Sequence, residues 1–310
     1  MSARRLALLF ALLLIARPMF AAELMDDDDD KPPSAAANAN QNAGRYFFGL
    51  LDHRSSYGKD FFPDALLGPE FDAEKQLDFD YLHAEKKGIR DDEIDAGFQW
   101  NVIGQLTISG EFGWDSEHQQ NLHGGAEGEN LDGESESGLE NVDLAVYHPI
   151  FQYVSGNGQF DYSAVVRLDV GIPTRGSPSS RDVLLTPYIG QLLRIGDHVS
   201  IEGWAGTQIT IAPHPADEFI YGASFGYTLF HNQFPVPATE KFVPMFEIDG
   251  QKPMSGVARE ALFGVSGFEV AFKSLGQVQP QLEIGYEFPI DQGAREQTRW
   301  GIVVQMFLEF

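Results

Sequence analysis

The chain has 310 residues, no cysteine and a formal net charge of −25, from 46 acidic and 21 basic residues. Without cysteine, neither a disulfide nor a cysteine-linked lipid anchor can form. Such an acidic chain has no basic surface with which to neutralise phosphates, so the composition excludes a nucleic-acid partner.

The first segment, residues 1–22, has the pattern of an export signal. Arg4 and Arg5 precede the apolar run LALLFALLLIA, residues 6–16. Basic residues followed by a short apolar run are typical of a secretory signal peptide, and this run is too short to span a bilayer as a helix. We predict that the segment is removed by cleavage near Ala21 or Ala22.

Two further segments precede the regular part of the chain. Residues 23–44 contain five consecutive Asp, a Pro pair and then small and polar residues, a composition that predicts a disordered acidic leader. Residues 45–76 are rich in aromatic side chains but have no sustained period. They fit an N-terminal lead-in strand, a lid or a plug segment equally well.

From Leu77 to the end of the chain, apolar and polar residues alternate. In LDFDYLHAE, for example, Leu77, Phe79 and Tyr81 alternate with Asp78 and Asp80. This period of two predicts strands that have one apolar and one polar face. The pattern recurs about twelve times, in residues 77–85, 93–104, 106–114, 139–153, 159–172, 182–195, 198–211, 218–230, 240–248, 261–272, 277–290 and 298–310.

Many alternating strands fit either a soluble sandwich or a membrane barrel whose apolar face meets lipid. Most of the predicted strands have about 9 to 14 residues, enough for a tilted crossing of the hydrocarbon layer. Tight turns, such as residues 196–197, alternate with long connections, such as residues 115–138. These features favour an all-β fold, an antiparallel up-and-down outer-membrane barrel of about 12 strands over residues 77–310. The connection at residues 231–239 is longer than this rhythm predicts, and four prolines lie inside predicted strands, where we expect bulges or strand ends.

Aromatic residues mark the ends of several strands and the end of the chain. Trp114, Phe219, Tyr221, Phe288 and Trp300 are expected to form interfacial girdles. In the last strand, Trp300, Met306, Leu308 and Phe310 occupy alternate positions. This ending resembles the terminal recognition strand of Gram-negative outer-membrane proteins, which the barrel-assembly machinery reads through a last aromatic residue. The resemblance implies that machinery as a partner, in addition to outer-membrane lipid and lipopolysaccharide.

The polar face of the strands would line the lumen. About twelve strands should leave a narrow passage, because eight strands are filled by side chains and sixteen leave an aqueous channel. Carboxylates outnumber guanidinium groups on this face, which favours cations or neutral polar molecules over anions. Trp204 offers a stacking surface for an aromatic ligand. The predicted solute path comprises Asp95, Asp161, Arg167, Asp169, Glu202, Trp204, Glu283, Glu287 and Arg299.

Part of the chain is similar to a known group of barrels. The stretches ENVDLAVYHPIFQY (140–153), VVRLDVGIPTRG (165–176) and TPYIGQLLRIGDHVSIEGWAG (186–206) look like outer-membrane transporters of the phenol meta-degradation pathway family. The resemblance implies a barrel of this size that passes small organic compounds. It defines no functional residues that can be carried over.

Other functions fit the sequence less well. A barrel lipid hydrolase needs a Ser next to a base, and none of His148, His198, His214 and His231 has a Ser in such a pattern, so we predict no catalytic site. The acidic connection around His118 and His123 matches no defined metal-site spacing, so we predict no metal and no cofactor. A non-conducting barrel with a structural or adhesive role remains the alternative to transport.

Overall fold

The computed structural model describes residues 44–47, 65–71, 75–86, 89–103, 105–119, 135–155, 159–174, 182–212, 217–230, 233, 236–255 and 259–310. The predicted signal peptide and all but the last residue of the predicted leader lie outside the described residues.

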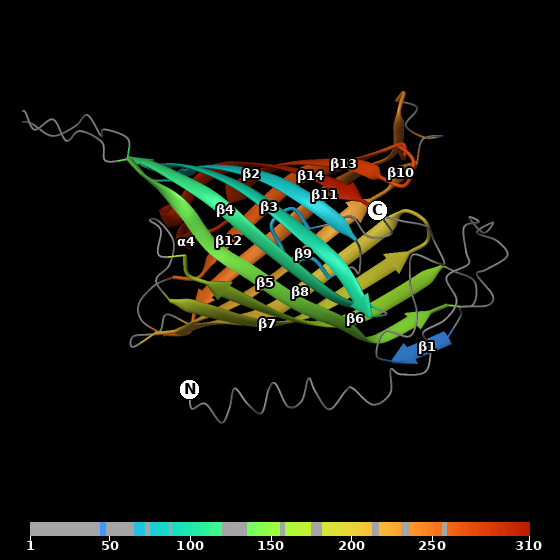
Figure 1. The fold of residues 1–310 in the computed structure, drawn as a ribbon, viewed down its shortest axis with the longest axis horizontal. Coiled ribbons are helices and arrows are strands. Elements are labelled where there is room, and N and C mark those ends of the chain that lie inside the picture. Colours follow the sequence, from blue (N-terminus) through green and yellow to red (C-terminus); the bar gives the residue numbers. More distant parts are fainter. Residues whose placement is uncertain are drawn as a thin grey trace, which may run out of the picture.

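Twelve long antiparallel strands form a closed barrel (Figure 1). Each strand pairs with its neighbours in the chain, the last strand pairs with β2, and β9 pairs directly with β11. The all-β, up-and-down class and the predicted number of strands are confirmed. The barrel strands are β2 (Gln76–Lys86), β3 (Ile89–Ile103), β4 (Leu106–Gln119), β5 (Ser135–Val154), β6 (Phe160–Ile172), β7 (Val183–Ile195), β8 (Val199–Ile211), β9 (Glu218–Tyr227), β11 (Thr239–Pro253), β12 (Ala261–Phe272), β13 (Gln279–Pro289) and β14 (Thr298–Glu309).

The two ends of the barrel differ. The turn end carries the C-terminus and the short connections, such as the one from Ile195 to Val199 between β7 and β8. The loop end, on the left of Figure 1, carries the helix α4 (Gln292–Gln297) and the longest hairpin, β4–β5. Two short strands lie at the turn end: β1 (Gly44–Phe47) pairs with β5, and β10 (Leu229–Phe230) pairs with β11.

The β4–β5 hairpin is longer than the sequence pattern predicts. Residues 115–138 were expected to form a connection, but the ladder continues through Asp115↔Gly138 to His118↔Ser135. Both faces of these added pairs carry polar or charged side chains, so they have no apolar alternation. Only the middle of the expected loop lies outside the described residues.

The four strand prolines lie where the ladder is interrupted or ends, as expected. Pro149 is next to a register shift in the β5–β6 ladder, and Pro187 falls in a gap in the β7–β8 ladder. Pro244 and Pro280 each lie one residue beyond the last pair on one side of their strand. Proline has no amide hydrogen to donate. At positions where the ladder is interrupted or ends, it therefore removes no hydrogen bond from the sheet.

The outer surface is apolar and the inner face is polar. On β14, Ile302 is 37% exposed and Met306 43%, whereas the inward Phe307 and Glu309 are 1% and 0% exposed. Large exposed apolar side chains recur on the other strands, and most of the buried polar residues are carboxylates and amides. A closed sheet that is apolar outside and polar inside is typical of an outer-membrane-type transmembrane barrel. Lipid can surround the apolar outer surface, and the backbone groups are hydrogen-bonded within the sheet. Among the described residues, no helix is long and apolar enough to cross a membrane.

Candidate functional site

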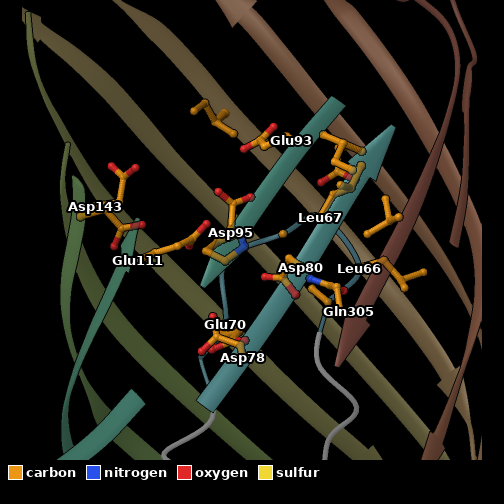
Figure 2. Close-up of a pocket in the computed structure, with 18 of the residues that line it drawn as sticks. Leu66, Leu67, Glu70, Asp78, Asp80, Glu93, Asp95, Glu111, Asp143 and Gln305 are labelled. Atoms are coloured by element: carbon orange, nitrogen blue, oxygen red, sulfur yellow. The ribbon is translucent and has the colours of Figure 1, made fainter. Parts of the chain in front are cut away.

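The lumen contains a cavity of about 610 Å³ whose lining is strongly acidic. Eleven Asp and Glu residues line it, against one Lys and one Arg. Several of these carboxylates are on β2 and β3, with others on β4 and β5 (Figure 2). The lining of the cavity therefore carries many more acidic than basic groups.

One wall of the cavity carries most of the acidic groups. Period two places Asp78 and Asp80 of β2, Glu93 and Asp95 of β3, Glu111 of β4 and Asp143 of β5 on the inner face. The register pairs Asp80 with Asp95, and Glu111 with Asp143. Like charges directly opposite each other destabilise a sheet unless water, protons or cations screen them. We call these six residues the acidic wall.

Each of the two basic residues of the lining contacts a carboxylate. The ammonium group of Lys86 binds Asp91, and Nε of Arg167 donates to Oδ1 of Asp169 at 2.7 Å. The Arg167 guanidinium also lies over the ring of Tyr147, 5.3 Å from its centroid. Both cations are thus engaged, and carboxyl groups far outnumber basic groups along the lining of the cavity.

Residues Ala65–Phe71, the inserted segment, lie inside the barrel and line the cavity from Ala65 to Glu70 (Figure 2). The backbone amides of Leu66 and Leu67 donate to the two carboxylate oxygens of Glu247, at 2.7 and 3.0 Å. At the other side, Nη1 of Arg167 donates to the carbonyl oxygen of Glu70 at 2.5 Å. The inserted segment therefore connects β11 to β6 across the lumen.

Apolar contacts also hold the inserted segment at the place that it occupies in the lumen, which we call its seat. Gly68 lies so close to Trp204 that a Cβ built on it would be 2.4 Å from Cζ2 of the indole. Phe71 fills the space above Gly190 and meets Tyr188 edge to face, with ring centroids 6.4 Å apart. These glycines leave room for aromatic rings that any other residue would displace.

The predicted solute-path residues fall into three groups. Asp95, Arg167, Asp169, Trp204 and Glu287 line the cavity. Asp161, Glu202 and Glu283 are buried nearer the turn end. Arg299 is exposed and lies at the register shift between Thr298 and Trp300, so it does not share the buried inner face.

Polar side chains pack against one another toward the turn end. Lys241 and Glu269 form an ion pair of 3.1 Å, and Nε2 of Gln152 donates to Oε1 of Gln105 at 3.0 Å. Because these residues are almost completely buried, this part of the lumen is much narrower than the cavity. The passage is thus widest toward the loop end.

Several cavity residues were missing from the predicted set. Asp78, Asp80, Glu111 and Asp143 obey the same alternation as Asp95, so the period-two rule applied to every strand would have identified them. Glu247 is not part of the cavity lining; it binds the inserted segment, and that segment has no periodic pattern from which the contact could be predicted.

Two groups of carboxylates are close enough to share a cation. Asp91, Asp115 and Glu117 form one group, and Glu93, Asp95 and Glu140 form the other. In each group one ligand atom per residue lies within 4.8 Å of the others. Oxygen ligands of this kind suit hard cations such as Ca²⁺.

The outer face near the loop end also carries two pairs of neighbouring polar side chains. His83 Nδ1 lies 2.8 Å from Oδ1 of Asp92, and the His83 ring is 5.0 Å from that of Trp300. Ser116 Oγ is 3.3 Å from Nε2 of His118; Ser116 is half-buried and His118 is exposed. His214 and His231, two of the histidines considered above, lie outside the described residues.

No family description matches the chain, and no curated protein matches it. Solved structures with a similar fold include an outer-membrane channel from Pseudomonas putida F1, with 10% sequence identity and a TM-score of 0.49 over 80% of this chain and 99% of that chain. The beta domain of the Bordetella autotransporter BrkA has 11% identity and a TM-score of 0.44, over 77% of this chain and 100% of that chain. A NanC porin has 8% identity and a TM-score of 0.42, over 76% of this chain and 98% of that chain.

Proposed function

We propose that the protein is a channel of the bacterial outer membrane that passes small cationic or polar organic solutes through a narrow acidic lumen. The observation that carries the proposal is the lining of the cavity, where eleven carboxylates face one Lys and one Arg. Carboxylate-lined pores favour cations, because the fixed charges raise the local concentration of counter-ions.

The apolar outer surface and the closed sheet support the location. Single-chain barrels of this kind are built for the outer membrane of bacteria. The predicted export signal at residues 1–22 fits the same destination. Outer-membrane lipid, lipopolysaccharide and the barrel-assembly machinery are the partners that this proposal implies.

Kinship with the phenol meta-degradation barrels is part of the proposal. It would make the solute a small organic compound, and the aromatic groups Trp204 and Tyr188 at the cavity are compatible with one.

The experiment is a measurement of ion current through the purified protein in planar bilayers. With a salt gradient, we expect a reversal potential of the sign that marks preference for K⁺ over Cl⁻. A current that prefers Cl⁻ would refute the acidic lumen as the selectivity element.

A non-conducting structural barrel is the second candidate. The inserted segment and the packed polar side chains toward the turn end favour it, since both narrow the lumen. Liposomes that contain the protein separate the two functions: a channel lets them swell in small polar solutes, whereas a non-conducting barrel does not.

A lipid hydrolase would need Ser116 and His118 on the outer face to act as nucleophile and base. Release of fatty acid from outer-membrane lipids, measured with Ser116→Ala as the control, tests this third function. We expect no difference between the two proteins.

A further inference from the structure

The inserted segment is bound in the lumen largely as a separate ligand would be. Ala65–Phe71 is not part of any strand and has no place in the register of the sheet. Its polar anchors include barrel side chains: Glu247 accepts from the amides of Leu66 and Leu67, and Arg167 donates to the carbonyl of Glu70. Nε2 of Gln76 also donates to Oε1 of Glu70, at 3.0 Å. The segment can therefore leave without breaking the sheet.

Glu247 would accept a cation in place of the segment. Its side chain is completely buried, with an exposed fraction of 0%, so it requires hydrogen-bond donors. In this structure, the amides of Leu66 and Leu67 supply two of them, and the backbone of Gly68 and the side chain of Asp249 also hydrogen-bond to the carboxyl group. An ammonium or guanidinium group offers several donors and also cancels the charge, which makes its hydrogen bonds about twice as strong as neutral ones.

Trp204 offers the apolar half of the same seat. The indole is only 4% exposed because Gly68 and Gly222 lie against it. A ring or a short alkyl chain that replaced Gly68 would keep this surface out of water. The carboxylate of Glu247 and the ring of Trp204 would therefore bind a ligand that has both a charged and an apolar part.

The surrounding charge selects the sign of the ligand. The acidic wall lies across the same cavity, where carboxylates far outnumber basic side chains. An anion that reached Trp204 would meet several acidic side chains, whereas a cation would be drawn in.

We propose that the seat of the inserted segment is a binding site for small organic cations with an aromatic or apolar body, and that such a cation displaces the segment. The charged group binds Glu247 and the apolar body packs on Trp204. This inference rests on the proposed function, because it needs a lumen that solutes can enter.

Equilibrium binding to the purified full chain in detergent tests the site. Phenethylammonium is the probe, with ethylammonium and phenylacetate as comparators that lack the ring and the positive charge, respectively. We expect phenethylammonium to bind more tightly than ethylammonium, and phenylacetate not to bind. Glu247→Gln should weaken phenethylammonium binding by about tenfold or more, as expected for loss of a charge-assisted hydrogen bond. Glu240→Gln, an exposed carboxylate of the same strand, should leave it unchanged.

A disulfide lock keeps the test decisive even if Glu247→Gln folds poorly. A Cβ built on Gly285 lies 3.4 Å from both Leu66 Cδ atoms, and the chain has no other cysteine. Leu66→Cys and Gly285→Cys can therefore be bridged through disulfides to one short bifunctional methanethiosulfonate, which spans more than the direct S–S bond allows. The cross-linked variant should lose phenethylammonium binding and regain it on reduction. Equal affinity in the two states would overturn the inference.

Binding and ion current are independent readouts. A protein that conducts cations but does not bind phenethylammonium overturns this inference alone. A protein that binds the probe and carries no current overturns the proposed channel alone.

Discussion

The indole of Trp204 lies directly against Gly68, with no room for a side chain between them. Gly68→Val should therefore expel the inserted segment from its seat, since overpacking of this kind costs about 1–3 kcal/mol. We expect a larger single-channel conductance and stronger acrylamide quenching of tryptophan fluorescence. Gly203→Val is the matched control, because a Cβ there meets only a backbone oxygen, at 3.9 Å. Equal conductance in the two variants would contradict the assignment of the inserted segment as an obstruction.

The acidic wall should set ion selectivity. Neutralising Glu111→Gln together with Asp143→Asn removes one directly opposed pair, so the reversal potential in a KCl gradient should move toward zero. The shift should be greater in dilute salt, because the Debye length is about 30 Å at 0.01 M and about 3 Å at 1 M. Asp92→Asn is the control: this carboxylate is on β3 but binds His83 and Arg90 on the outer face. A reversal potential that responds equally to both changes would argue against a selective inner wall.

Arg167 should contribute to stability through two separate contacts. It donates to Asp169 and to the inserted segment, so Arg167→Ala leaves a half-buried carboxylate without this partner. Because the two side chains are 13% and 22% exposed, we expect a cost of about 1–3 kcal/mol, less than for a fully buried pair. The free energy of unfolding in urea and detergent micelles measures this effect. Arg259→Ala, which breaks an ion pair with Glu296 between side chains that are 57% and 59% exposed, should cost only about 0–1 kcal/mol.

The depth at which outward-facing residues lie in the membrane can be tested on one strand. Ile189 is at the middle of β7 and Ile195 at its turn end, and both point outward. Ile189→Arg should destabilise the folded barrel in lipid by about 2–4 kcal/mol, and Ile195→Arg by about 0–1 kcal/mol, because the cost of a charge falls toward the interface. Similar losses at both positions would show that the two do not differ in membrane depth.

Phe310 should matter for assembly in the cell more than for stability. Its amide donates to the carbonyl of Lys75 at 2.9 Å, next to the closing pair of β14 and β2. Deleting Phe310 should lower the amount of heat-modifiable, folded barrel in the outer membrane. Refolding of the same variant in detergent should match the wild type, since one terminal hydrogen bond contributes only about 1 kcal/mol. A parallel loss in detergent would point to stability and away from recognition by the assembly machinery.

The sequence predicts best the strand segments whose outer faces contact lipid. Strands β6, β7 and β8 match their predicted ranges closely, because their apolar faces alternate and their turn-end connections are tight. Pairs such as Glu117↔Glu136 lie beyond the apolar layer. There both faces meet water, so the strand continues with no amphipathic pattern to reveal it.

The site is less visible in the sequence for two reasons. A register shift between Thr298 and Trp300 moves Arg299 off the inner face, and a simple count of alternate residues cannot detect such a bulge. The inserted segment is placed by Glu247, which is 180 positions away from Leu67. Contacts of that separation leave no local signal in either stretch of chain.

Only three residues of chain separate Phe71, the last residue of the inserted segment, from Lys75 at the start of the barrel. An occupant attached so closely acts at an effective concentration in the millimolar range, whatever the composition of the medium. A free solute of ordinary affinity would therefore displace the inserted segment only when the concentration of that solute outside the cell was high. The barrel would then behave as a threshold device, closed to scarce compounds and open to plentiful ones.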